Sequence, residues 1–188
     1  WAAWLHYSMG LSFDKVAKLF AERFGLAVTA GALCQAAQST STDLVAVTTE
    51  IARRLNNSAM VAMDETGWRI NGEHAWLWVA TNCDVTFYNV AYGRGFDQAT
   101  DIIDEDFDGI VVRDGWAPYR RYTKATHQTC LAHLCRRCDE MIADLPAWAR
   151  GTPREVKAIL GQALDARDLD ADKPVSYTHL TLPTILRV

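Results

Sequence analysis

The sequence lacks several features that would assign the protein to a specialised class. No apolar run approaches the roughly 20 residues that a membrane-spanning helix needs, so we expect no membrane span. The first residues, Trp1 to Trp4, contain neither an initiator Met nor a basic segment followed by an apolar core, so we do not expect them to be a signal peptide. We therefore expect the chain to begin inside a longer protein. No internal repeat or long low-complexity segment is visible.

The sequence also lacks an excess of basic residues. Its 19 Lys and Arg against 23 Asp and Glu give a net charge of −4, whereas an isolated DNA-binding domain is typically basic. This balance argues against nucleic acid as a partner without excluding it, because a metal-dependent nuclease core carries acidic residues for its cations and DNA contacts can be local. The 49% hydrophobic and 22% charged content is that of an ordinary globular protein.

Cysteines are few and odd in number, which without secretory features predicts reduced thiols in a cytosol. The five are Cys34, Cys83, Cys130, Cys135 and Cys138. The last three lie close to His127 and His133 in the sequence, and Cys135-x-x-Cys138 with Cys130 or His133 can ligate zinc. Residues 131–145, however, are expected to form one helix, which would spread these side chains around its circumference. The alternative is buried reduced Cys with structural His.

The N-terminal segment, residues 1–57, is predicted to be helical. Ser12 is suited to cap a helix that ends at Gly25, and Thr29 is suited to cap the next. Two short helices joined by a Gly-containing turn are typical of a helix-turn-helix unit. The same pattern fits any αα-hairpin, which is commoner than a DNA reader. Asn56 to Ser58 should end the helical part.

Residues 58–173 are predicted to form an α/β domain. A short apolar run, 59–63, indicates a buried strand that ends at Asp64. Two further strands, 75–81 and 85–91, follow an Asn-Gly turn signal and complete an antiparallel meander. We then expect a helix at 96–103, strands at 109–113 and 126–130, and helices at 131–145 and up to about residue 169. This order matches an RNase H-like mixed sheet flanked by helices.

Two aspartates occupy matched settings in this pattern. Asp64 and Asp114 each follow a run of apolar strand residues and each precede residues that turn the chain. If the two strands are neighbours, both carboxylates enter one cleft at the rim of the sheet. Two close carboxylates repel, and Mg²⁺ is the natural hard cation to relieve that conflict. An aspartate after a strand is also common in turns and caps, so neither residue is decisive alone.

The sequence around these aspartates resembles the catalytic core of the insertion-sequence-66 transposase family. The motifs that carry the resemblance are DETGWR at 64–69, AWLWV at 75–79, RG at 94–95, DFDG at 106–109, DGWAPY at 114–119 and HQTCLAHLCR at 127–136. The likeness is close over roughly 59–142 and looser over the helical N-terminal segment. Several motifs in the right order are more specific than any one.

The resemblance implies an RNase H-like DDE transposase that cleaves DNA and transfers strands with Mg²⁺ or Mn²⁺. Asp64 matches the first catalytic acid and metal ligand, and Asp114 matches the second. The third, a Glu, has no counterpart here, so we expect a truncated and inactive fragment. The implied partners are insertion-element terminal repeats, target DNA and further copies of the chain in a homo-oligomer. The implied location is the bacterial cytoplasm, at the nucleoid. An RNase H-like nuclease, or a zinc-stabilised DNA-binding module without catalysis, remains the alternative.

Further residues near the two aspartates are candidates for contacting DNA or for supporting the carboxylates. Aromatic and basic side chains here are suited to phosphate and base contacts, although the basic ones can equally be solvated surface. The candidates are Arg113, Trp116, Tyr119, His127, Gln128, His133 and Arg136.

The last residues, 174–188, differ in character from what precedes them. The stretch from Val175 to Thr184 is Thr-rich and free of charge. It resembles a translated sequencing-library adapter, so we predict a non-native tail that should be left out of fold reasoning. The alternative is a genuine β-strand tail.

Overall fold

The computed structural model describes residues 1–169, so the predicted non-native tail lies outside the described residues. The chain divides into two compact units, Trp1–Glu50 and a second that begins at Ile51. Helix α3 (Val45–Asn56) contributes to both. Among the described residues no helix combines the length and the apolar character needed to cross a membrane.

The N-terminal unit contains a short helical turn, η1 (Trp4–Ser8), followed by α1 (Phe13–Phe24) and α2 (Ala30–Asp43). The predicted caps are confirmed. The hydroxyl of Ser12 accepts a hydrogen bond from the Lys15 amide, and that of Thr29 accepts one from Ala32. Gly25 ends α1 with a φ of +65°, a conformation that glycine adopts without the penalty of a Cβ.

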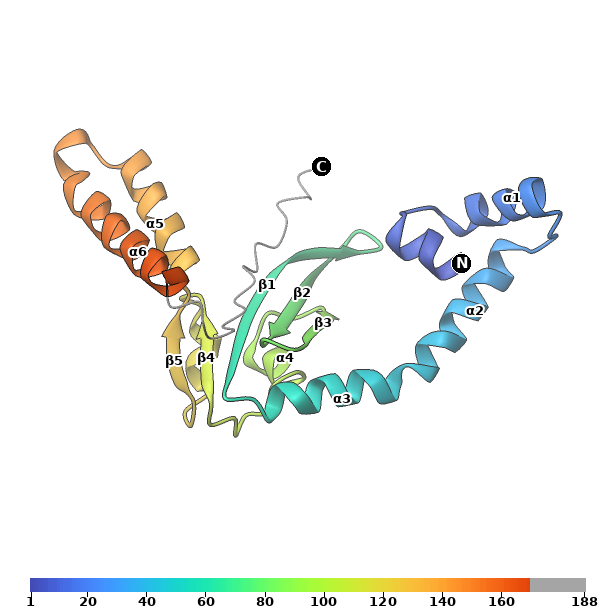
Figure 1. The fold of residues 1–188 in the computed structure, drawn as a ribbon, viewed down its shortest axis with the longest axis horizontal. Helices are drawn as coiled ribbons and strands as arrows, with labels where there is room; N and C mark the ends of the chain where they lie inside the picture. Colours follow the sequence, from blue (N-terminus) through green and yellow to red (C-terminus); the bar gives the residue numbers. More distant parts are fainter. Residues whose placement is uncertain (170–188) are drawn as a thin grey trace. The chain divides into compact units, whose positions relative to one another are not determined.

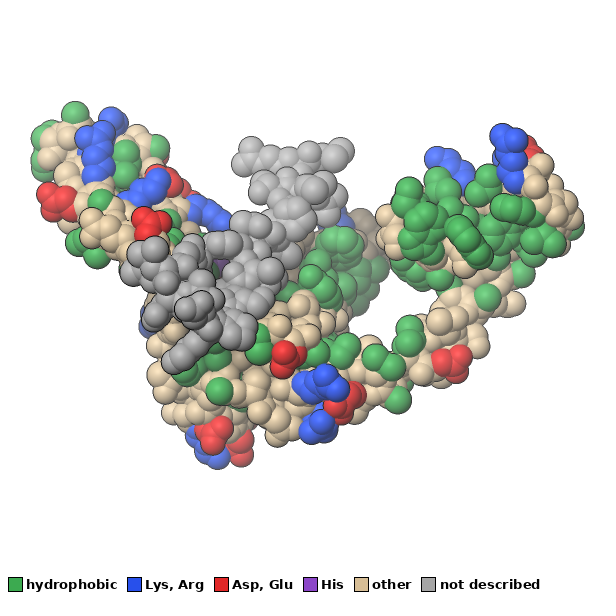
Figure 2. Space-filling view, in the orientation of Figure 1, with side chains coloured by type: hydrophobic (Ala, Val, Ile, Leu, Met, Phe, Trp, Pro, Cys, Tyr) green, Lys and Arg blue, Asp and Glu red, His purple; other side chains and the backbone are tan. Residues whose placement is uncertain are grey.

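The surface of the N-terminal unit is rich in hydrophobic side chains (Figure 2). Val16 and Leu33 are its buried apolar residues. Large apolar side chains nevertheless remain exposed, among them Trp1, Trp4, Tyr7, Met9, Phe24, Leu26 and Val28. A patch of this kind on a folded unit is typical of a surface that contacts something else.

The second unit is built on a five-stranded mixed sheet in the order β3-β2-β1-β4-β5 (Figure 1). Strand β1 pairs antiparallel with β2, and β2 with β3, whereas β4 pairs parallel with β1, and β5 with β4. The strands are β1 (Met60–Ile70), β2 (Glu73–Thr81), β3 (Thr86–Ala91), β4 (Ile110–Arg113) and β5 (Thr126–Thr129). The predicted α/β fold with a mixed sheet, flanking helices and a helical N-terminal segment is confirmed.

Strand β1 is longer than its apolar run predicts. The expected end at Asp64 is wrong, because β1 continues to Ile70 and pairs with β2 along its whole second half, from Glu65 opposite Trp78 to Ile70 opposite Glu73. The predicted Asn-Gly turn is confirmed, with φ of 52° at Asn71 and 87° at Gly72. A tight hairpin turn of this kind keeps polar residues in register beyond the buried part of a strand.

The helices of the second unit largely follow the sequence pattern. They are α4 (Phe96–Thr100), η2 (Ala117–Arg121), α5 (Leu131–Asp144), η3 (Ala147–Ala149) and α6 (Gly151–Leu169), and α5 packs against α6. Helix α4 stops before the predicted Ile103. The side chain of Asn56 accounts for this, since its amide nitrogen donates to the Ile102 carbonyl and its oxygen accepts from the Asp104 amide. These bonds replace those of a continued helix.

The core of the second unit lies on one face of the sheet. Val61 and Met63 from β1 and Trp78 from β2 pack there with residues of the connecting segments. The remaining buried members are Leu55, Ala80, Phe96, Ala99, Ile102, Ile103, Phe107, Val111, Tyr119 and Tyr122. The helices and loops before and after β4 therefore cover this face, and β4 ends at Arg113, level with the middle of the longer β1.

Candidate functional site

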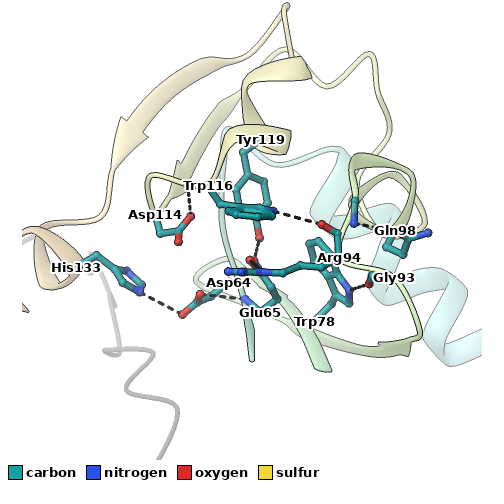
Figure 3. A network of polar contacts seen from close by, with 11 residues as sticks. Asp64, Glu65, Trp78, Gly93, Arg94, Gln98, Asp114, Trp116, Tyr119 and His133 are labelled. Atoms are coloured by element: carbon teal, nitrogen blue, oxygen red, sulfur yellow. Dashed lines mark hydrogen bonds and ion pairs between the residues drawn. The ribbon is translucent and has the colours of Figure 1, made fainter. Parts of the chain in front are cut away.

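Asp64 and Asp114 are brought side by side by the pairing of β1 with β4. The last paired residues in this parallel ladder are Ala62 and Val112. Asp64 and Asp114 each follow this last pair by two residues, and Asp114 is among the charges that act on the Asp64 carboxylate. Neighbouring strands lie about 4.8 Å apart, and paired residues share a face of the sheet. Both carboxylates therefore project together from the rim (Figure 3).

The third parallel strand extends this row. Arg113 pairs with Thr129 in the β4–β5 ladder, so the next residue pair in register is Asp114 and Cys130. Helix α5 begins directly after Cys130. His133 lies in the first turn of α5, and its imidazole Nε2 is 3.8 Å from Oδ2 of Asp64.

The Asp64 carboxylate is partly buried and sits among charged groups. Its Oδ1 accepts a hydrogen bond of 2.9 Å from the Glu65 amide. Burial raises the pKa of Asp64 and Asp114 raises it further, against the opposing effects of His133, of the Glu65 amide and of Arg136. The carboxylate therefore holds its charge less readily than an exposed aspartate, and a cation beside it would stabilise that charge.

The Asp114 carboxylate is oriented by the turn that follows it. Its Oδ1 accepts a 2.7 Å hydrogen bond from the Trp116 amide. The guanidinium of Arg113 donates to the Asp114 carbonyl at 2.7 Å. Arg137 of α5 lies against Gly115, so closely that a Cβ there would stand 2.6 Å from its guanidinium. Cationic groups from β4 and α5 thus flank the loop that carries this aspartate.

Glu65 follows Asp64 but faces the opposite side of the sheet, because alternate residues of a strand point to opposite faces. Its side chain is fully buried. One carboxylate oxygen accepts a 2.8 Å bond from Nε of Arg94, and the other accepts a bond from the Tyr119 hydroxyl. Burial raises the pKa of Glu65, and the bonds from Tyr119 and Arg94 oppose that rise.

Arg94 is fixed from both sides. Its guanidinium carbon lies 4.4 Å from the centre of the Trp76 ring and 4.0 Å from that of Trp116. Its carbonyl accepts a 3.3 Å bond from the Trp116 indole. The preceding residue, Gly93, accepts a 3.2 Å bond from the Trp78 indole. The guanidinium stacks on two indole rings and donates a hydrogen bond to the buried Glu65 carboxylate, so it has little conformational freedom.

The comparison with known families agrees with this arrangement. A family model described as Transposase IS66 family matches residues 1–173. The chain belongs to the IS66 transposase family. None of the curated proteins compared matches the chain. Membership shows a transposase in general terms, an enzyme class that acts on DNA.

Some of the further candidate residues lie close to the two aspartates in the fold. His133 stands beside Asp64, Trp116 is partly buried next to Asp114, and Arg136 is exposed on α5. Gln128 is exposed and pairs with Val112, on the face that carries the two aspartates. His133 and Arg136 are thus near Asp64, whereas the Trp116 indole stacks on Arg94, on the side of the sheet that holds Glu65.

Two candidates lie elsewhere. Tyr119 is completely buried, and its hydroxyl donates to Glu65, so of its two predicted roles the supporting one is the one that its position suits. His127 pairs with Val111 on the core side of the sheet, and its Nε2 lies 3.0 Å from the Tyr122 carbonyl. It is therefore engaged away from the two aspartates. The family resemblance indicated His127, and nearness to Asp114 in the sequence indicated Tyr119. Neither signal says which face of the sheet a side chain will occupy.

Sequence reasoning also missed the roles of Glu65 and Arg94. The RG motif at 94–95 was noted only for its likeness to the family. Nothing in the composition of this motif indicates that the Arg94 guanidinium binds the carboxylate of Glu65, which lies 29 residues earlier in the chain. The available signal was the position of Glu65 in a strand, one residue from Asp64 and in phase with the buried Val61 and Met63.

The two aspartates suit a hard divalent cation. Mg²⁺ keeps several waters and is commonly held by one or two carboxylates, and this site offers two adjacent ones. Within residues 1–169, no cluster of three or more His, Cys, Asp or Glu side chains is arranged to hold a metal ion. The Cys/His group lies partly on the continuous helix α5, and no observation there favours zinc.

Proposed function

We propose that Asp64 and Asp114 are two acidic ligands of a divalent-cation site at which DNA strands are cleaved and transferred. The observation that supports the proposal is the parallel register of β1 and β4, whose last pair, Ala62 and Val112, lies two residues before each aspartate. Membership of the IS66 transposase family supplies the DNA substrate class. The specific substrates proposed are insertion-element ends and target DNA.

The residues around the pair have distinct tasks in this proposal. A bound Mg²⁺ or Mn²⁺ would activate water or a DNA 3′-hydroxyl and stabilise the leaving oxygen. Asp64 and Asp114 hold the cation, and the Trp116 amide keeps the Asp114 carboxylate in one orientation. Arg136 and Arg137, on the exposed side of α5, are suited to bind the phosphate backbone and so position the scissile bond.

The wider organisation follows the same proposal. The helical segment 1–57 would contribute to DNA recognition, and the RNase H-like core 58–173 would carry the chemistry. Catalysis by a DDE site needs a third acid. Residues 1–169 contain no group of three or more His, Cys, Asp or Glu side chains placed to hold a metal ion. We therefore expect the chain to bind cations weakly and to transfer no strands by itself. In the active assembly we expect several copies on DNA.

Mn²⁺ binding to the whole chain tests the proposal. In a titration followed by electron paramagnetic resonance, Asp64→Asn and Asp114→Asn should each weaken Mn²⁺ binding about tenfold or more, because each removes an anionic ligand. Excess Mg²⁺ should displace the Mn²⁺. Asp84→Asn, at an exposed turn between β2 and β3, is the matched control and should bind as the unaltered chain. Equal loss in the control, or no loss in the first two variants, would contradict the proposal.

A further inference from the structure

Glu65 is an unusual residue for the inner face of a sheet. Its side chain has no exposed surface, and its neighbours in phase on β1, Val61 and Met63, are apolar core residues. Burying a carboxylate costs free energy even when it is paired, and a hydrophobic residue in such a place often gives equal or greater stability. The charge at this position therefore calls for an explanation other than stability.

The first of two connections from Glu65 leads to the Asp114 loop through Tyr119. Tyr119 lies in η2, which begins two residues after Gly115, and its ring is completely buried. The hydroxyl donates to one oxygen of Glu65. Because η2 follows the loop directly, this bond ties the loop to β1 at the residue next to Asp64.

The second connection runs through Arg94 and Trp116. Glu65 holds the Arg94 guanidinium, which stacks on the Trp116 indole at 4.0 Å from its centre. The Arg94 carbonyl accepts from the same indole. The Trp116 amide in turn donates to Oδ1 of Asp114. Figure 3 shows these contacts from Glu65 through Arg94 and Trp116 to Asp114, together with the separate bond from Tyr119 to Glu65.

The segment that carries Arg94 is itself anchored to the fold. The buried Trp78 donates to the Gly93 carbonyl, and the Gln98 side chain accepts from the Gly95 amide. A Cβ on Gly93 would stand 2.4 Å from Oε1 of Gln98, so the segment is packed closely against its own cap. The backbone at Arg94 is therefore held in place independently of the loop that carries Asp114, so Arg94 can restrain that loop.

We propose that Glu65 is a positioning residue, which uses Tyr119 and Arg94 to lock the Asp114 loop onto β1 and so sets the placement of Asp114 beside Asp64. The inference rests on the proposed function of the two aspartates. Glu65 itself touches neither substrate nor cation, because it lies on the opposite face of β1. Glu65 instead affects the relative position of Asp64 and Asp114, and so the geometry with which they bind a cation.

The test compares two buried tyrosines whose hydroxyls donate to different acceptors. Tyr119→Phe removes the bond to Glu65, and Tyr122→Phe removes a buried bond of 2.9 Å to the Ile103 carbonyl. Both rings are fully buried. We expect Tyr119→Phe and Glu65→Gln to weaken Mn²⁺ binding between about 10-fold and 100-fold, the range for groups that orient metal ligands. Tyr122→Phe should leave Mn²⁺ affinity unchanged while it lowers stability.

A second measurement needs no metal. Hydrogen exchange of the Trp116 amide, followed by NMR, should accelerate in Tyr119→Phe and Glu65→Gln relative to Tyr122→Phe, because only the first two release the loop. Should Glu65→Gln fail to fold, Tyr119→Phe decides the matter alone. Mn²⁺ binding that depends on Asp64 yet ignores Tyr119→Phe would overturn this inference and leave the proposed function standing. A chain whose Mn²⁺ binding is indifferent to Asp64→Asn would overturn both.

Discussion

Two consecutive acidic residues of β1 illustrate how little a residue type says about its role. Asp64 and Glu65 carry the same charge, but strand alternation sends one to the rim and the other into the core. Asp64 stays partly exposed beside Asp114, and Glu65 is enclosed by Arg94 and Tyr119. The first is suited to bind a cation, and the second to hold the structure around it.

Gly109 offers a prediction at the same scale. A Cβ at this position would lie 2.5 Å from the Phe107 ring and 2.8 Å from the Ala59 carbonyl oxygen. Backbone cannot move aside cheaply, so Gly109→Ala should lower the free energy of unfolding by about 1–3 kcal/mol. Urea unfolding followed by circular dichroism measures the change.

Gly161 provides the matched control for Gly109. It lies in α6 with nothing within 4 Å of an added Cβ. Gly161→Ala should be neutral or stabilise by up to about 1 kcal/mol, because alanine favours the helix. A Gly109→Ala chain as stable as the Gly161→Ala chain would show that the close approach to Ala59 is not maintained in solution.

At the scale of elements, the long β1–β2 hairpin depends on its turn. Gly72 has a φ of 87°, a value that strains any residue with a Cβ. Gly72→Ala should cost about 1 kcal/mol and loosen the pairing beyond Asp64. The measurement is the free energy of unfolding, together with hydrogen exchange of the β2 amides.

Gly67 is the comparison within the same hairpin. It lies inside β1 with open space around its Cα and does not have a positive φ. Gly67→Ala should therefore be neutral or slightly stabilising, since glycine weakens a strand interior. If Gly67→Ala and Gly72→Ala lowered the free energy of unfolding equally, the positive φ at Gly72 would not be the cause of the loss.

At the scale of the whole molecule, helix α3 joins the two compact units and ends inside the core of the second. Leu55 is fully buried against the sheet residues, whereas Leu44, just before α3, is 48% exposed. Leu55→Ala should cost about 2–5 kcal/mol through the cavity it leaves. Leu44→Ala should change stability little, and denaturant unfolding of both variants gives the comparison. A small loss for Leu55→Ala would mean that the end of α3 is not integral to the second unit.

Local chemistry in the sequence accounted for several features that the structure confirms. Ser12, Gly25 and Thr29 marked helix ends because their side chains or their freedom at positive φ satisfy those ends directly. Asn71 and Gly72 marked the hairpin for the same local reason. The apolar run before Asp64 marked a buried strand. Its true end was missed, since the second half of β1 is held by cross-strand pairs with β2.

The sequence by itself determined the family resemblance, the α/β class and the pair of aspartates worth examining, because motifs, caps and periodicity are written in neighbouring residues. Only the tertiary structure decided that β1 and β4 are adjacent and in a register that aligns Asp64 with Asp114. It alone decided that Glu65, Arg94 and Tyr119 meet and that the Tyr119 side chain is buried. These outcomes depend on contacts between residues far apart in the chain, which strand pairing and burial select and local sequence does not encode.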